Sequence, residues 1–316
     1  MRLDLLAPLL VTGAAAALVG LERRFPYRSG QKFFRPGFVT DLLLYTLAQS
    51  WALGVVIAYL CARLDALTGL SRLHLVSRWP WGLQLLFFFV EHDLYIYLFH
   101  RWQHHNRFLW RIHEAHHSVK DVDWLAGARS HALEILVNQT VEFAPMVLLG
   151  ASPLVPLLKG VIDAVWGMWI HSNVEVHTGW LQKILNGPEM HRWHHAVEIK
   201  KGGVNFATKL ALWDWLFGTA ALPRRKPRGY GLADPGYPAG WLGQHLHAFR
   251  PFPPAGGRRG RRGGPARRGG ASIFRAVATH QARRPLAWLL PVLALSGLGG
   301  FLASRLELET EFERLL

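Results

Sequence analysis

Five long apolar stretches in the first 175 residues restrict this chain to folds that a membrane can hold. They lie at Leu3–Leu21, Phe38–Ala62, Leu83–Phe99, about Leu133–Leu149 and about Leu154–Ile170. A helix needs roughly 20 apolar residues to cross a bilayer core about 30 Å thick, so these stretches predict membrane helices. The last two are joined by Gly150, Ser152 and Pro153 and predict a helical hairpin that either spans or re-enters the membrane.

The distribution of positive charge predicts an orientation. The loop at residues 22–37 holds Arg23, Arg24, Arg28, Lys32 and Arg35. Such loops remain on the cytoplasmic side. Two further crossings return the chain to that side at His100, and the hairpin returns it there at His171. We therefore expect an integral protein of the bacterial inner membrane, with its histidine clusters on the cytoplasmic face. We expect the first stretch to be an uncleaved anchor, because it lacks a small-x-small cleavage site.

The formal net charge of +15 would indicate a nucleic-acid ligand on a soluble protein. Here the Lys and Arg residues lie mostly between the apolar stretches, which is typical of cytoplasmic loops and favours anionic lipid, so no nucleic-acid partner is expected. Cys61 is the single cysteine, which excludes an intrachain disulfide and a cysteine-bound iron–sulfur cluster. The chain is therefore expected to carry no electron carrier of this kind.

Three histidine clusters share a helical spacing. They are His100-x3-His104, His113-x2-His116-His117 and, after 73 intervening residues, His191-x2-His194-His195. Positions i, i+3 and i+4 share one face of a helix, so each cluster is expected to direct its imidazoles at one point. Eight imidazoles exceed the about four ligands of a tetrahedral zinc and indicate two metal ions. Imidazole also binds iron, copper or nickel, so the ligand type alone does not identify the metal.

These clusters and their neighbours resemble the fatty acid hydroxylase/sterol desaturase superfamily. The matching segments are Asp93-x3-Tyr97-x2-His100-Arg101, LWRIHEAHHS at 109–118, Pro188-x2-His191-Arg192-x-His194-His195 and LWDWLFGT at 212–219, and the resemblance covers roughly residues 35–230. It implies a di-iron centre that uses O2 and external electrons to hydroxylate or desaturate a membrane lipid, whether fatty acyl, sterol or another isoprenoid. The electron donor would be a ferredoxin or a cytochrome. The fold class expected is all-α, a polytopic membrane bundle whose cytoplasmic histidine-rich cap holds the two metals.

The resemblance also assigns the metal ligands. Eight are carried over directly: His100, His104, His113, His116, His117, His191, His194 and His195. His171 and His177, in HSNVEVH just after the fifth apolar stretch, are further candidate ligands, with hydrogen bonding around the centre as the alternative. His105 should face about 100° away from His104 and is not expected to bind.

Several other residues are expected to support the ligands. Asp93 and Tyr97 share a helical face with His100, and an acid such as Asp93 or Asp214 can orient a ligand imidazole. Helix packing is the alternative role. Arg129, His131 and Glu134 are interpreted as structural or supporting residues, with Ala132 replacing the proline that is usual in the family. His74, His92, His245, His247 and His280 fit no motif and are interpreted as ordinary histidines.

One segment departs from the family pattern. The family commonly has Asp-x-Asn-Tyr-Gly after the last cluster, whereas this chain has Gly203-Val204-Asn205-Phe206-Ala207. Asn205 is kept as a supporting residue, but the acid, the tyrosine hydroxyl and the glycine are replaced.

Two other classes of function remain open from the residues alone. A zinc-dependent membrane hydrolase would need an open zinc site and a general base. Glu114 in HEAHH superficially fits, but HExHH is not HExxH. A metal-binding or transport protein without catalysis would place its ligands at membrane depth on several helices, whereas these lie at helix ends.

The chain is expected to divide into three parts. Residues 1–250 would form the membrane di-iron domain, with 172–250 as a cap of short helices. Residues 251–270, which include PPAGGRRGRRGGPARRGG, predict a disordered Gly/Arg-rich linker. Residues 271–316 contain the apolar run Leu286–Ala303, long enough for a further membrane helix, and the end LELETEFERLL resembles the start of an RND-type exporter. We expect this tail to take no part in the metal site.

Overall fold

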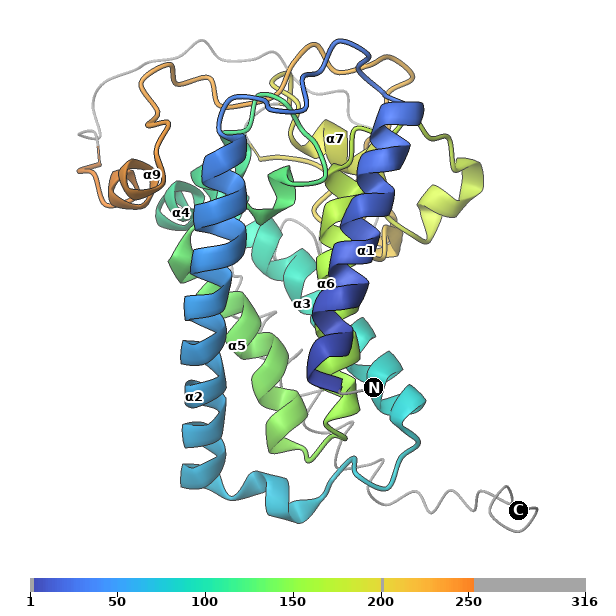
Figure 1. Ribbon diagram of the computed structural model, residues 1–316, viewed down its shortest axis with the longest axis vertical. Helices are drawn as coiled ribbons and strands as arrows, with labels where there is room; N and C mark the ends of the chain where they lie inside the picture. Colours follow the sequence, from blue (N-terminus) through green and yellow to red (C-terminus); the bar gives the residue numbers. More distant parts are fainter. Residues whose placement is uncertain (1–2, 200–201, 253–316) are drawn as a thin grey trace.

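The computed structural model describes residues 3–199 and 202–252, which form a helical bundle capped at one end by short helices and loops (Figure 1). The elements are α1 Leu3–Arg24, the π-helical η1 Thr40–Gln49, α2 Ser50–Thr68, η2 Leu70–Leu73, α3 Trp81–His105, α4 Arg107–His117, η3 Ala126–Ala128, α5 Ala132–Leu148, α6 Leu154–His171, η4 Gly179–Lys183, α7 Pro188–His194, α8 Leu212–Leu216 and α9 Trp241–His247. This arrangement confirms the predicted all-α membrane bundle.

Among the described residues, four helical segments are long and apolar enough to cross a bilayer. They are Leu5–Arg24, Thr40–Thr68, Trp81–His105 and Leu154–His171. The helix α5, with 17 residues, is shorter and is followed by α6 across a turn in which Gly150 has a φ of 73°. The protein is therefore an integral membrane protein, and each of the five predicted apolar stretches falls on a helix.

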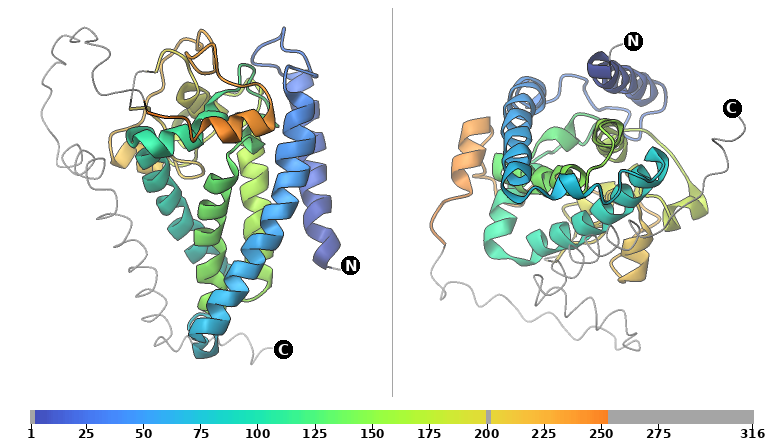
Figure 2. Two further views of the ribbon diagram at one scale, coloured as in Figure 1. Left: turned by 90° about the vertical axis from the view of Figure 1, so that its left-hand side faces the viewer. Right: turned by 90° about the horizontal axis from the view of Figure 1, so that it is seen from below.

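The outer helices present apolar side chains outward. On α2, Trp51 is 75% exposed and Tyr59 is 62% exposed, which suits contact with lipid. The opposite side of α2 buries Ile57 and Cys61 against Ala144 of α5. Figure 2 shows the axes of α1 and α2 lying roughly along those of α5 and α6, and together with α3 these helices form the membrane part of the bundle.

The third predicted stretch was expected to end at Phe99, but α3 continues to His105. Asn106 then separates α3 from α4, because its side chain accepts hydrogen bonds from the backbone N–H groups of Phe108 (2.9 Å) and Leu109 (3.0 Å). This N-cap starts a new helix in a new direction. The corner brings the histidines of α4 toward those at the end of α3.

The basic loop after α1 packs against the chain that leaves α6. Tyr27 donates its backbone N–H to the carbonyl of Asn173 (2.8 Å), and Pro26 forms an isolated β-bridge with Val174. The positively charged loop and the histidine-bearing ends of the helices therefore lie at the same end of the molecule (Figure 1).

A buried ion network holds the loop before η1 against the cap. The Arg35 guanidinium bonds Asp123 on one side (2.7 and 2.8 Å) and Asp41 on the other (2.7 Å). Arg129 shares the same Asp41 carboxylate through two bonds of 2.7 and 2.9 Å. Bidentate pairs of this kind fix geometry as well as charge.

The predicted linker beyond Phe252 and the predicted tail helix Leu286–Ala303 lie outside the described residues.

Candidate metal centre

Nine histidines converge in two groups at the capped end of the bundle. The first group is His100, His104, His113, His117 and His194, and the second is His116, His171, His191 and His195. Within each group the candidate ligand atoms all lie within 4.8 Å of one another. The groups adjoin, since the ring centroids of His117 and His195 are 4.7 Å apart. The arrangement can hold two metal ions side by side.

Helical pitch divides each three-histidine cluster between the two groups. Residues four apart differ by about 40° around a helix, whereas residues three apart differ by about 60° in the opposite sense. His113 and His117 of α4 therefore share the first group, while His116 points into the second. Likewise His191 and His195 join the second group and His194 the first. The expectation that each cluster addresses one point is corrected: the i, i+4 pair goes to one group and the i+3 residue to the other.

The Nδ1 atoms of five of these histidines point outward to fixed acceptors. The pairs are His100 with the Phe206 carbonyl (2.8 Å), His116 with the Arg129 carbonyl (3.2 Å), His171 with the Gly167 carbonyl (2.7 Å), His194 with the Val204 carbonyl (2.8 Å) and His113 with the Glu134 carboxylate (2.8 Å). A carbonyl oxygen can only accept, so Nδ1 carries the proton and Nε2 is left with its lone pair.

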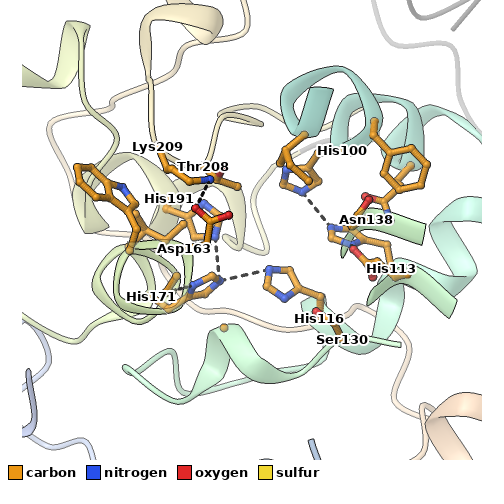
Figure 3. A pocket seen from close by; sticks show the side chains of 18 of the residues that line it. His100, His113, His116, Ser130, Asn138, Asp163, His171, His191, Thr208 and Lys209 are labelled. Atoms are coloured by element: carbon orange, nitrogen blue, oxygen red, sulfur yellow. Dashed lines mark hydrogen bonds and ion pairs between the residues drawn. The ribbon is translucent and has the colours of Figure 1, made fainter. Parts of the chain in front are cut away.

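These Nε2 atoms face one another. Nε2 of His171 lies 3.3 Å from Nε2 of His116 and 2.9 Å from Nε2 of His191 (Figure 3). In the first group, Nε2 of His100 lies 3.0 Å from Nε2 of His113. Two lone pairs at this distance repel each other, whereas nitrogens bound at about 2.0–2.2 Å to a shared ion are naturally this far apart. The donor set therefore fits two imidazole-bound metal ions.

Burial keeps these imidazoles neutral. It lowers the pKa of His113 and of His116 to about 3. It also lowers the pKa of His117 well below its ordinary value, with the neighbouring His194 adding to the effect. Neutral imidazole is the form that binds a metal, so the site is prepared for metal rather than for protons.

Among the described residues, Glu134 of α5 is the acid that orients a ligand, His113. Asp214 instead accepts from the backbone N–H groups of Phe206 (2.8 Å) and Ala207 (2.9 Å), and so acts on His100 through the Phe206 carbonyl.

Asp93 accepts from the backbone N–H groups of Lys209 (2.9 Å) and Leu210 (2.8 Å) and fixes the following turn. In the part of the chain described, neither Asp93 nor Asp214 contacts an imidazole directly. Both place a backbone segment.

Arg129 and His131 support the site from the segment before α5. The Arg129 carbonyl receives His116, while its guanidinium is anchored on Asp41. His131 accepts from the backbone N–H of Leu133 (3.1 Å) and so caps α5 at its N-terminus. It belongs to neither histidine group.

Asn205 and Tyr97 act at a distance from the metals. The Asn205 amide donates to the carbonyl of Met190 (2.8 Å), beside His191, from a backbone with a φ of 54°. The Tyr97 hydroxyl lies 3.0 Å from the Thr219 hydroxyl. At Gly203, which replaces the usual acid, a Cβ would lie 2.9 Å from Nδ1 of His104, so the glycine leaves room for that ring.

His177 is the predicted candidate that the structure does not bring to the others. Its side chain is 82% exposed and lies 3.3 Å from Glu189 and 3.4 Å from Glu175. His105 is also outside both groups, and its Nδ1 donates to the Arg101 carbonyl (2.7 Å).

Two histidines without a motif make polar contacts with residues distant in sequence. Nε2 of His245 accepts from the backbone N–H of Ala132 (3.0 Å), and its ring lies 4.5 Å from that of His131. His92 belongs to a buried polar group with Glu142 and Asp163. Both contacts join residues distant in sequence, so no local spacing marks them. The acidic residues Glu142 and Asp163, which lie inside predicted apolar stretches, were the sequence signal available for the group around His92.

The family model described as Fatty acid hydroxylase matches residues 85–219, which contain all nine converging histidines. The chain is 35% identical over 149 residues to ornithine lipid hydroxylase OlsE of Rhizobium tropici, covering 47% of this chain and 45% of the relative. It is 31% identical over 159 residues to alkylglycerol monooxygenase of Homo sapiens, covering 50% and 34%.

It is also 30% identical over 150 residues to the very-long-chain aldehyde decarbonylase GL1-11 of Oryza sativa subsp. japonica, covering 43% and 52%. The chain thus spans about half or less of the length of these relatives. No solved structure matches the chain.

Proposed function

Residues 85–219 belong to the fatty acid hydroxylase family, and from this premise we propose that the protein is a membrane oxygenase that hydroxylates or desaturates a lipid. One observation carries the proposal: two groups of largely buried imidazoles, five and four in number, converge where the membrane helices α3 and α6 end. A soluble substrate would not require a site in this position.

We propose two iron ions as the bound metals, with the nine histidines of the two groups as ligands. Iron with O2 supplies the strong oxidant that an inert C–H bond requires. For hydroxylation, a C–H bond is broken and a C–O bond is formed with one oxygen atom of O2. The other oxygen leaves as water, taking up two protons and two electrons from an external donor.

The protein's own contribution is to fix and shield the donor atoms. The Nδ1–H bonds to backbone carbonyls hold the rings in one tautomer, and burial keeps them uncharged. The Phe206 carbonyl lies in the cap and accepts from His100 of α3, so the cap and the bundle must pack together for the site to form.

The substrate class follows from access and from the relatives. The names of these relatives specify an ornithine lipid, an alkylglycerol and a very-long-chain aldehyde, each of which joins a polar group to a hydrocarbon chain. A cavity of about 200 Å³ reaches His100 and His171 from between the membrane helices. We propose that an amphipathic lipid enters this cavity from the bilayer.

Electrons are proposed to arrive on the opposite side of the centre. A second cavity of about 500 Å³ exposes His104 and His195 toward the cap, and its lining includes Arg107, Arg111 and Arg250. An acidic ferredoxin or cytochrome suits such a positively charged opening. Lipid and electron donor would then reach the metals from different sides.

We propose that the capped end faces the cytoplasm of a bacterial cell. The basic loop at 22–37 lies at this end, in accord with the positive-inside tendency. In a Cys61→Ala background, a cysteine at the exposed Trp180 should react only from the cytoplasmic side, and one at the exposed Leu73 only from the outside. The reverse pattern would overturn the orientation.

Metal analysis and product analysis test the function together. Protein purified from iron-replete cells should hold about two irons, and the host lipids should gain oxygen or a double bond. His116→Ala and His194→Ala each remove one donor and should abolish product, while the exposed His177→Ala should match the wild type. One zinc and no iron would contradict the proposal.

A further inference from the structure

A layer of buried charges crosses the middle of the membrane bundle. Lys159 of α6 has no exposed surface, and its ammonium lies 2.8 Å from Glu142 of α5, 2.6 Å from Asp163 and 3.0 Å from Nδ1 of His92 on α3. Ionisable side chains at membrane depth are costly and usually serve a function. We name these four residues, together with Lys209, the polar floor.

Lys209 joins the polar floor from the cap. Its ammonium lies 3.1 Å from Asp163. Its backbone is held by Asp93, which also lies 3.7 Å from the same ammonium. Asp163 is thus shared between two lysines that come from opposite parts of the chain, which fixes the orientation of its carboxylate.

The polar floor lies at one depth below the metal centre on three helices. Three floor residues, one on each helix, are eight positions from a residue of the centre, a separation of about 12 Å along a helix. The pairs are His92 and His100 on α3, Glu142 and Glu134 on α5, and Asp163 and His171 on α6. On each of the three helices, the floor residue lies farther from the cap than the residue of the centre does.

The cavity of about 200 Å³ joins the two layers. Its lining includes His100, His116 and His171 of the centre and His92, Asp163 and Lys209 of the polar floor (Figure 3). The Asp163 side chain retains 20% of its exposure, in contrast to Lys159, which has none. Asp163 is therefore the floor carboxylate available to a molecule in the cavity.

His92 supplies a complementary donor. An ammonium group only donates, so Nδ1 of His92 accepts from Lys159 and the ring proton lies on Nε2. That Nε2 is buried and has no hydrogen-bond partner among the described residues. Buried donors of this kind normally have an acceptor. The cavity thus offers an N–H donor from His92 and a carboxylate acceptor from Asp163.

The charge balance of the polar floor excludes an anionic ligand. The ammonium groups of Lys159 and Lys209 face the carboxylates of Glu142, Asp163 and Asp93, so no positive charge is left uncompensated. His92, Glu142 and Asp163 have the composition of a metal site, but the Lys159 ammonium lies within 3.0 Å of all three and already provides the cation.

We propose that the polar floor binds a neutral hydrogen-bonding group of the substrate, a hydroxyl or an amide, which donates to Asp163 and accepts from His92. Ligand pockets usually measure about 300–1,000 Å³, so this cavity receives only part of a lipid. Because the polar floor lies about 12 Å from the metal centre, the carbon that is oxidised is separated from this hydroxyl or amide by about 12 Å of the lipid chain. This inference rests on the proposed oxygenase function.

Two variants and one control test the inference in membranes of a bacterial host. His92→Phe removes the donor and Asp163→Asn removes the carboxylate. Thr140→Val removes a buried hydroxyl that has no hydrogen-bond partner in the described part of the chain; Thr140 lies on α5 and outside the cavity lining. Bound iron is measured for each protein, and tandem mass spectrometry locates the oxygen inserted into the host lipids.

We expect the wild-type product to carry its new oxygen about 12 Å along the chain from a hydroxyl or amide of the lipid. His92→Phe and Asp163→Asn should keep their iron and lower product at least tenfold, while Thr140→Val keeps both. A new oxygen directly beside the hydroxyl or amide, or in a lipid that has neither group, would overturn the inference, even if a variant fails to accumulate. So would full product from iron-loaded His92→Phe. Iron-loaded wild type without any oxidised lipid would instead overturn the oxygenase function itself.

Discussion

At the scale of single residues, Glu134 shows how one side chain can prepare a metal ligand. Its carboxylate receives Nδ1 of His113, which leaves Nε2 free for a metal. Glu134→Ala should weaken metal binding roughly 10–100-fold, as is usual when such a partner is lost. Glu134→Gln keeps a carbonyl acceptor and should retain most of the affinity. Chelator competition measures both, with Glu189→Ala beside His177 as the control, and wild-type affinity in Glu134→Ala would contradict this role.

The histidines also predict a pH dependence. Burial lowers the pKa of His113 and His116 to about 3, whereas an unfolded histidine has a pKa near 6.5. Between about pH 3 and about pH 6.5 these histidines are protonated in the unfolded chain but not in the folded chain. Their contribution to the free energy of unfolding is therefore fully present above about pH 6.5 and is lost as the pH falls toward about 3. The thermal unfolding midpoint of metal-free protein in detergent should be lower at pH 5 than at pH 7.5. An equal midpoint at both would mean that these rings are not held neutral.

Residue identities could be predicted where chemistry follows from local spacing, and not where it depends on distant partners. His100, His113 and His194 were identifiable because their spacing is periodic. The carbonyl of Phe206, which receives His100 across 106 positions, has no sequence signature because every residue carries a carbonyl. His177 stands in a histidine-bearing segment, but the chain turns outward after α6, and the side chain lies in solvent instead.

At the scale of elements, the approach of η3 to α6 controls the second histidine group. A Cβ on Gly127 would lie 2.7 Å from Nδ1 of His171 and 3.0 Å from the Gly167 carbonyl that this ring requires. Gly127→Ala should therefore displace His171 and reduce bound iron from about two toward one per chain.

Gly167→Ala is the matched control for this prediction. Gly167 lies about one turn before His171 on α6, and a Cβ there would meet nothing within 4 Å. This variant should keep both metals. If the two substitutions lowered the iron content equally, the close packing of η3 on α6 would not be the cause.

The positions of elements were more predictable than their relations. The apolar stretches located α5 and α6 to within about two residues, since lipid requires continuous helical hydrogen bonding. The corner at Asn106 and the insertion of Lys209 among the membrane helices depend on tertiary packing. The pattern of apolar residues in the sequence therefore could not predict either of them.

At the scale of the whole molecule, the end of the described chain closes over α4. Arg250 pairs its guanidinium with Glu114 (2.8 and 3.0 Å), and Arg111 donates to the Pro251 carbonyl (3.0 Å) while lying 3.6 Å from the Phe252 ring centre. Glu114 is the neighbour of His113. These contacts place residues 250–252 with the catalytic part of the molecule.

We name the contacts of residues 250–252 with Glu114 and Arg111 the clasp. The clasp extends the proposed oxygenase domain from residue 250 to residue 252, and the tail remains a separate part. A chain ending at Phe252 keeps the clasp and should retain its iron and its product, because nine candidate ligands lie before that point. A chain ending at Ala248 loses the Arg250–Glu114 pair and should hold its metal less stably, with faster release to a chelator. Membrane fractions of the two chains, compared with full-length protein for iron and oxidised lipid, decide between the cases. Loss of iron from the chain ending at Phe252, while it remains in the membrane, would show that the tail belongs to the enzyme.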